Sequence, residues 1–103
     1  MSDDSQALIP PSFMALFLRP GSIKPCEPRH VIAARYELCE DMAQMLIEPA
    51  QTRLFELGIT EADVLERVHR GLVVDGSPVD TAEAQWVLCR LAELLKWPAP
   101  PFG

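Results

Sequence analysis

The chain has 103 residues, of which 49% are hydrophobic and 23% are charged, a size and composition that fit one ordinary globular domain. These values exclude a disordered or collagen-like chain. The formal net charge of −6 disfavours a protein that binds nucleic acid through phosphate contacts. Ten prolines, about twice the average usage, lie mostly towards the two ends of the chain. We therefore expect an N-terminal arm over residues 1–28, a helical core over residues 29–97 and a proline-rich tail over residues 98–103.

The N-terminal arm contains an apolar stretch that predicts a short helix near residues 12–18. Ser12 is the expected N-cap of this helix, because its hydroxyl can accept a hydrogen bond from a backbone N–H of the first turn. Phe13, Leu16 and Phe17 leave the helix almost no polar face. It therefore has to be covered on most sides, either by the rest of the chain or by another subunit.

A long helix is expected to begin near Pro28, a residue suited to the first helical position. One apolar stripe follows its 3.6-residue period through Val31, Leu38, Met42, Met45 and Leu46, with Ile32 and Cys39 at the edge. Pro49 lacks an N–H, so the helix either kinks there or restarts with Pro49 in its first turn. Leu54, Phe55 and Leu57 continue the apolar pattern until Gly58, a natural helix terminator.

Two further helices are indicated by their capping residues. Thr60 is the expected N-cap of the first, which ends at Gly71 or Gly76. Overlapping capping boxes at 77–80 and 80–83 start the last helix, which is expected to run to Trp97. The buried faces are predicted to contain Val64, Leu65, Val68 and Leu72 in the former helix and Ala84, Val87, Leu88, Leu91, Leu94 and Leu95 in the latter. Together these patterns predict an all-α fold, an irregular bundle of four or five helices.

Sequence motifs for catalysis are weak. The pairs Glu27/His30 and Glu66/His69 have the E-x-x-H spacing of di-metal helical bundles, but such sites need further inward-facing glutamates, so we interpret both as surface pairs. The glycines at 71 and 76 imitate a phosphate-binding loop, yet Ser77 and Pro78 stand where a lysine and a hydroxyl residue are required. We expect no enzymatic activity, no metal and no cofactor.

Cysteine usage and the N-terminal sequence bear on location. The cysteines at 26, 39 and 89 are odd in number and far apart, which is typical of reduced thiols. The chain opens with two acids where a secretory signal needs positive charge, and its longest uncharged run is too short to cross a membrane. These features predict a cytoplasmic protein with no membrane contact.

The last helix carries the strongest signal for a binding surface. Trp86 and Trp97 are eleven residues apart, about three helical turns, with Arg90 and Glu93 between them. Tryptophan and arginine are enriched at protein interfaces. The predicted interface consists of Phe13, Leu16, Phe17, Trp86, Arg90 and Trp97, unless the N-terminal segment covers the two tryptophan rings within the same chain. The leading hypothesis is a small, acidic protein–protein interaction module that forms a homodimer.

The alternative hypothesis is a DNA-binding regulator that uses residues 50–70. This stretch has the order helix, glycine-containing turn, helix that is typical of a helix–turn–helix. Its second helix opens with Glu61, Asp63 and Glu66, which phosphates repel, and Arg67 and Arg70 follow only later. Nucleic acid is therefore the less favoured partner.

Four segments together resemble a family of short proteobacterial proteins that are sometimes catalogued as "ATPase with chaperone activity". The segments are residues 9–13 (IPPSF), 35–41 (RYELCED), 54–58 (LFELG) and 64–67 (VLER). The resemblance spans nearly the whole chain and implies a bacterial, cytoplasmic protein.

Overall fold

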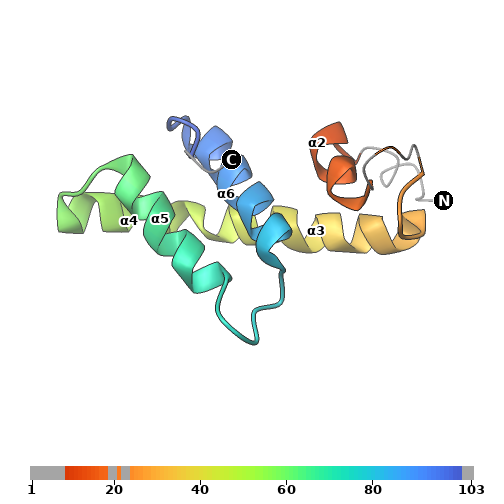
Figure 1. Cartoon of the computed structure of the whole chain (residues 1–103). Coiled ribbons are helices and arrows are strands. Elements are labelled where there is room, and N and C mark those ends of the chain that lie inside the picture. Colours follow the sequence, from red (N-terminus) through yellow and green to blue (C-terminus); the bar gives the residue numbers. More distant parts are fainter. Residues whose placement is uncertain (1–8, 19–20, 22–23, 101–103) are drawn as a thin grey trace. The chain divides into compact units, whose positions relative to one another are not determined.

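The computed structural model describes residues 9–18, 21 and 24–100 (Figure 1). Its elements are α2 (Pro11–Met14), the 3-10 helix η1 (Ala15–Phe17), α3 (Arg29–Met45), α4 (Ile47–Leu57), α5 (Glu61–Leu72) and α6 (Thr81–Leu95). Within the described ranges, an isolated antiparallel bridge between Leu18 and Pro25 is the only β-type pairing. The predicted all-α class is confirmed. The chain divides into two compact units, with the boundary between Leu38 and Cys39, inside α3.

In the N-terminal unit, α2 begins one residue earlier than predicted and uses a different cap. The carbonyl of Pro10 accepts hydrogen bonds from the backbone N–H groups of Phe13 and Met14, both at 3.0 Å, and Pro11 occupies the first turn. Ser12 lies inside the helix, so the predicted Ser12 cap is wrong. The reason is that Pro11 has the fixed backbone angle and the missing N–H that suit a first helical position.

Phe13 anchors the packing of this unit. Its side chain is fully buried, and its ring lies 5.6 Å from the rings of both Phe17 and Tyr36, the latter in an edge-on arrangement. Because Tyr36 lies on α3, the first half of that helix groups with the N-terminal segment. The division predicted from the sequence instead places all of α3 in the helical core of residues 29–97. The start of α3 is capped by the carbonyl of Pro28, which accepts hydrogen bonds from the N–H groups of Val31 and Ile32.

In the C-terminal unit, Pro49 separates two helices. α3 ends at Met45, Leu46 is the N-cap of α4, and Pro49 lies in the first turn of α4. The alternative left open by the sequence is therefore resolved in favour of a restart. Proline has no N–H to donate to the carbonyl four residues back, and a helix start is the place where that loss matters least.

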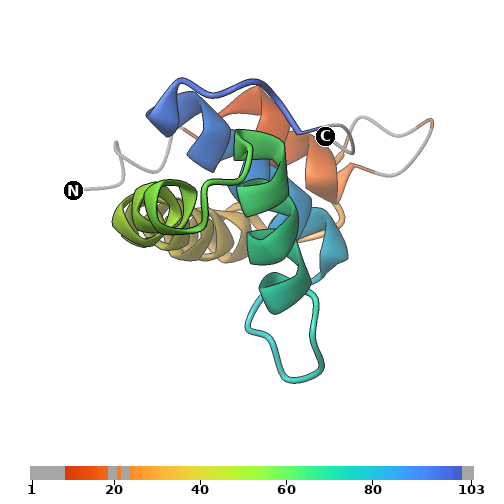
Figure 2. The same ribbon diagram turned by 90° about the vertical axis from the view of Figure 1, so that its left-hand side faces the viewer.

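The core of this unit lies among α4, α5 and α6. α5 packs against both α4 and α6, and α4 also contacts α6 (Figure 1). The fully buried members of this core are Ala50, Val64, Leu65, Leu88, Leu91 and Ala92, with Leu46, Ile47, Leu54, Ile59, Val68, Leu72, Leu95 and Trp97 packed around them. The predicted buried face of α5 is thus confirmed, and so is that of α6 except at Leu94, which lies outside this core. The loop that joins α5 to α6 projects away from the helices in both views (Figures 1 and 2).

The apolar stripe predicted on α3 is wrong at Met45, and the buried face of the helix is centred on other residues than those predicted. Met45 is 70% exposed, whereas Ile32 and Cys39, placed at the edge of the stripe, are fully buried. Ala33 and Ala43 are buried as well. The pattern of large apolar residues misplaced the centre of the buried face, because small alanines can also occupy the most crowded positions of a helix face.

The helix ends of this unit follow the capping signals only in part. Thr60 accepts a hydrogen bond from the N–H of Asp63 at 3.1 Å, and Gly58 ends α4 with a φ of 63°. Asp80 and Glu83 form a complete capping box, with hydrogen bonds of 2.8 and 3.0 Å. These predictions are confirmed. The end predicted for α5 is wrong, since the helix passes through the glycine at 71 and stops at residue 72.

The C-terminus of α6 is closed by a Schellman motif that has no glycine. Lys96 adopts a left-handed conformation with φ 61°, the N–H of Lys96 donates to the carbonyl of Glu93, and the N–H of Trp97 donates to the carbonyl of Ala92 at 2.9 Å. The predicted helix end at Trp97 is therefore wrong. Because of this left-handed turn, Trp97 lies outside the helix and packs against the core of this unit.

Lys96 gives a first testable prediction. A left-handed backbone costs an L-residue about 1 kcal/mol, and glycine avoids that cost. We expect Lys96→Gly to be about 1 kcal/mol more stable than Lys96→Ala, which removes the same charge but keeps the strained backbone. Urea unfolding of the two variants measures the difference, and equal stabilities would contradict the expectation.

Candidate functional site

The residues predicted to form an interface are mostly covered within the chain. Phe13 is fully buried and Trp86 is only 9% exposed, while the other predicted members, Leu16, Phe17, Arg90 and Trp97, are partly buried. In the N-terminal unit, the Phe13–Phe17–Tyr36 cluster accounts for two of them. That these residues bind a partner stays a prediction, but little of their surface is accessible to one.

The two tryptophans do not form one stripe with Arg90. Trp86 lies within α6, whereas Trp97 follows the left-handed residue Lys96 and packs against the core cluster of α4, α5 and α6. The spacing of eleven residues places two side chains on one meridian only if the helix is continuous between them. The helix ends at Leu95, before Trp97 is reached, so the two tryptophans and Arg90 do not make the continuous surface that the sequence suggested.

Arg90 is held by acidic side chains of its own unit. Its guanidinium makes two hydrogen bonds to the Glu40 carboxylate, at 2.8 and 3.1 Å, and a third to Glu93 at 3.1 Å, while Gln44 donates to Glu40 at 2.9 Å. The hydrogen bonds from Arg90 lower the pKa of the Glu40 carboxyl, against the opposing effect of burial. In return, Glu40 raises the pKa of Arg90. Arg90 therefore links α6 to the second half of α3, and its positive charge is already paired within the chain.

Among the described residues, the groups that could support metal or nucleophilic chemistry lie apart from one another. Both residues of Glu27/His30 are exposed, and in Glu66/His69 the glutamate is ion-paired with Arg70 at 3.2 Å. In the part of the chain that the structure describes, no group of three or more His, Cys, Asp or Glu could hold a metal ion. Burial, with a smaller contribution from the charge of Glu93, raises the pKa of the Cys89 thiol, which disfavours a reactive thiolate.

The stretch over residues 50–70 has the helix, turn, helix order on which the DNA-binding alternative depends. α4 and α5 pack together and are joined by three residues that begin with Gly58. The first turn of α5 carries Glu61 and Asp63, and Arg70 near its end is ion-paired with Glu66. This charge distribution is unsuited to a helix that lies against phosphates. DNA binding stays a prediction, which the order of the elements fits and the charges disfavour.

The most exposed large apolar side chain of the described residues lies on α4. Phe55 is 89% exposed, although Leu54 beside it packs on the core. Successive helical residues are about 100° apart, so the core contacts of Ala50 and Leu54 turn Phe55 away from the interior. A phenyl ring in this position contributes almost no hydrophobic stabilisation to the fold, because it buries almost no surface there.

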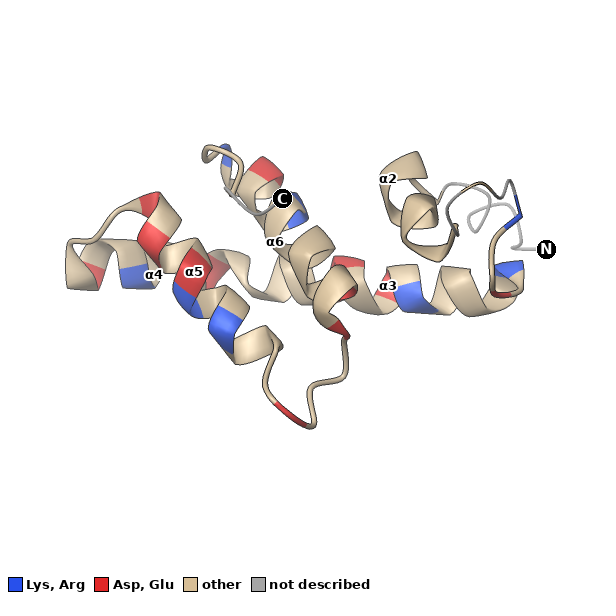
Figure 3. Cartoon of the chain, viewed as in Figure 1, with Lys and Arg blue, Asp and Glu red and all other residues tan. Residues whose placement is uncertain are grey.

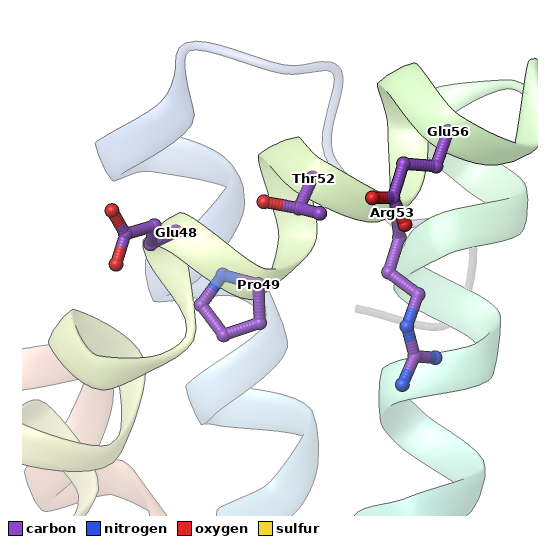
Figure 4. Close-up of a pocket in the computed structure, with 5 residues that line it drawn as sticks. All are labelled: Glu48, Pro49, Thr52, Arg53 and Glu56. Carbon is purple, nitrogen blue, oxygen red and sulfur yellow. The ribbon is translucent and has the colours of Figure 1, made fainter.

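A shallow hollow of about 370 Å³ lies on the outer side of α4, along the same helix (Figure 4). The residues that line it are Glu48, Pro49, Thr52, Arg53 and Glu56. Pro49, Thr52, Arg53 and Glu56 recur at i, i+3, i+4 and i+7, the spacing of a single helix face. The short side chains of Pro49 and Thr52 lie between the longer charged side chains of Glu48 on one side and of Arg53 and Glu56 on the other (Figure 4).

The acidic groups of this outer face are not held in ion pairs, although Glu48 lies in the first turn of α4, where the helix dipole favours a negative charge. Glu48 and Glu56 are exposed and make no hydrogen bond or ion pair to any described residue. This contrasts with the acids that the fold does use, Glu40 in the Arg90 pairing and Glu83 in the capping box. We call the set Glu48, Pro49, Thr52, Arg53, Phe55 and Glu56 the α4 outer face.

Sequence reasoning missed this face because it took Phe55 as part of the continuing apolar pattern. A signal was nevertheless present: once the restart at Pro49 is known, Leu54 and Phe55 cannot both face a core that lies on one side of a helix. The restart was the alternative that the sequence left open.

Comparisons with protein family models, with curated proteins and with solved structures give no match. The resemblance to the short proteobacterial proteins therefore stays a prediction. Among the helices of the described residues, none combines the length and the apolar character that a membrane crossing requires.

Proposed function

We propose that this chain is a small helical module that works by binding another protein and not by catalysis. The observation that carries the proposal is Phe55, which is 89% exposed although Ala50 and Leu54 of the same helix pack on the core. Aromatic side chains are enriched at protein interfaces, and a helix is a rigid support for such a contact. The free thiols at Cys26, Cys39 and Cys89 support a reducing compartment, the cytoplasm, as the location.

The predicted homodimer is one form of this proposal. In that form a second copy covers apolar surface of the first, through the aromatic residues identified from the sequence or through the α4 outer face. Because Phe13 and Trp86 are buried in the single chain, the α4 outer face offers the more accessible contact.

Site-specific photo-crosslinking in cells that express the protein tests the proposal. With a photoreactive phenylalanine analogue at position 55, we expect a discrete cross-linked product, because the ring would lie against the partner. The matched control carries the analogue in place of Val74, an apolar residue that is 56% exposed in the loop between α5 and α6. A product of twice 11.5 kDa would indicate the homodimer. Equal, diffuse products from the two positions would contradict the proposal.

A further inference from the structure

We infer that the partner of the α4 outer face is a cationic segment that carries apolar side chains, such as a basic amphipathic helix of another protein. The inference rests on the proposed function and adds the chemistry of the partner. It is carried by three observations on α4: an exposed aromatic ring, a hollow along the same helix, and acidic side chains that no described residue pairs with.

The ring and the hollow give the face its shape. Phe55 lies seven residues after Glu48 and three after Thr52, which places it next to two residues that line the hollow. A partner that covers Phe55 therefore lies close to Glu48 and Thr52, at one edge of the hollow. Such a contact is small, and it suits one helix or extended segment and a transient complex.

The charges select the class of partner. Residues 45–63 contain four acids, Glu48, Glu56, Glu61 and Asp63, against the single base Arg53. The red segment near the end of α4 and the red segments at the start of α5 lie at the same end of this unit, with a blue segment of α4 beside them (Figure 3). A partner with lysines or arginines around an apolar centre matches this distribution, since complementary charge speeds encounter and fixes orientation.

The same charges disfavour a second copy of the chain as the occupant. In a two-fold homodimer the same patch lies on both sides of the interface, so the acidic groups around Phe55 would face one another. Like charges placed together at an interface are costly. The α4 outer face is therefore better matched to a basic partner than to itself.

A titration with model peptides tests the inference on the full chain. The probe is an amphipathic helical peptide of leucine and lysine, about 14 residues or four turns long. One control peptide replaces every lysine by glutamate, and a second keeps the lysines but replaces the leucines by serine. We expect only the leucine–lysine peptide to bind in the micromolar range, with affinity falling as salt is added. Backbone amide shifts measured by NMR should map to α4.

Variants of the protein locate the contact. Phe55→Ser should weaken binding of the leucine–lysine peptide by about tenfold, as truncation of a central aromatic anchor does. Glu48→Gln combined with Glu56→Gln should weaken it severalfold and reduce its salt dependence. Val74→Ser and Asp75→Asn, in the exposed loop between α5 and α6, are the matched controls and should bind like the unmodified chain.

The outcomes separate the inference from the proposed function. Equal binding of the lysine–serine peptide, or a loss in the Asp75→Asn variant as large as in the glutamate variant, would show attraction to bulk negative charge and would overturn the inference. A chain that ignores all three peptides but forms a dimer that Phe55→Ser weakens would overturn the basic partner and leave the interaction module standing. A chain that binds no peptide, remains monomeric and gives no specific cross-link at position 55 would overturn both.

Discussion

Replacing Phe13 with alanine is expected to lower the free energy of unfolding by about 3 kcal/mol, the typical cost of deleting a buried aromatic side chain. The Phe13 side chain is fully buried and lies in ring contact with Phe17 and Tyr36. Its removal leaves a cavity that the short helices α2 and η1 can close only in part. The loss should be seen in urea unfolding and, by hydrogen exchange, as faster exchange in the first half of α3.

Phe55→Ala is the matched control, because it makes the same chemical change at a ring that is almost fully exposed. It should change the stability by less than about 0.5 kcal/mol, as ordinary surface substitutions do. Similar stabilities of the two variants would contradict the assignment of Phe13 to the core of its own unit. The contrast matters for function, since a residue whose removal unfolds its surroundings is a poor guide to a binding surface.

Local signals in the sequence were sufficient for much of the C-terminal unit. The hydroxyl of Thr60, the Asp80–Glu83 pair and Gly58 each act within a few residues of their own position, so their roles could be derived from neighbouring residues alone. The buried faces of α5 and α6 could be derived in the same way, because each helix has one dense apolar stripe.

Other features depend on contacts that no local pattern encodes. Lys96 adopts a left-handed conformation that its residue type does not favour, and this single residue moves Trp97 from a proposed surface stripe to the core. The burial of Phe13 depends on Tyr36, which is 23 residues further along the chain. The apolar character of Phe55 suggested burial, whereas the position of the α4 restart turns it outward. Apolar residue type alone therefore could not separate core from binding surface.

The ion pair between Arg90 and Glu40 gives the second large effect, together with a pH dependence. Arg90→Met removes a two-fold hydrogen-bonded pair and leaves the partly buried Glu40 carboxylate with only Gln44, so we expect a loss of about 1–2 kcal/mol at pH 7. The pKa of Glu40 is lowered in the folded chain. The stabilisation is therefore present above the ordinary carboxyl pKa of 4.5 and is lost as the pH falls through the lower, folded value.

The stability difference between the unmodified chain and Arg90→Met should thus be constant near neutrality and narrow below about pH 4.5. Arg70→Met is the matched control, since Arg70 pairs with Glu66 on an exposed turn of α5 and such pairs contribute about 0.5 kcal/mol or less. Denaturant unfolding at several pH values measures both. A gap that persists unchanged into acid would mean that Arg90 stabilises α6 through the packing of its hydrocarbon stem and not through the charge on Glu40. A gap that closes in acid would identify Glu40 as an acid whose charge the fold uses, in contrast to Glu48 and Glu56, whose charges remain available to a partner.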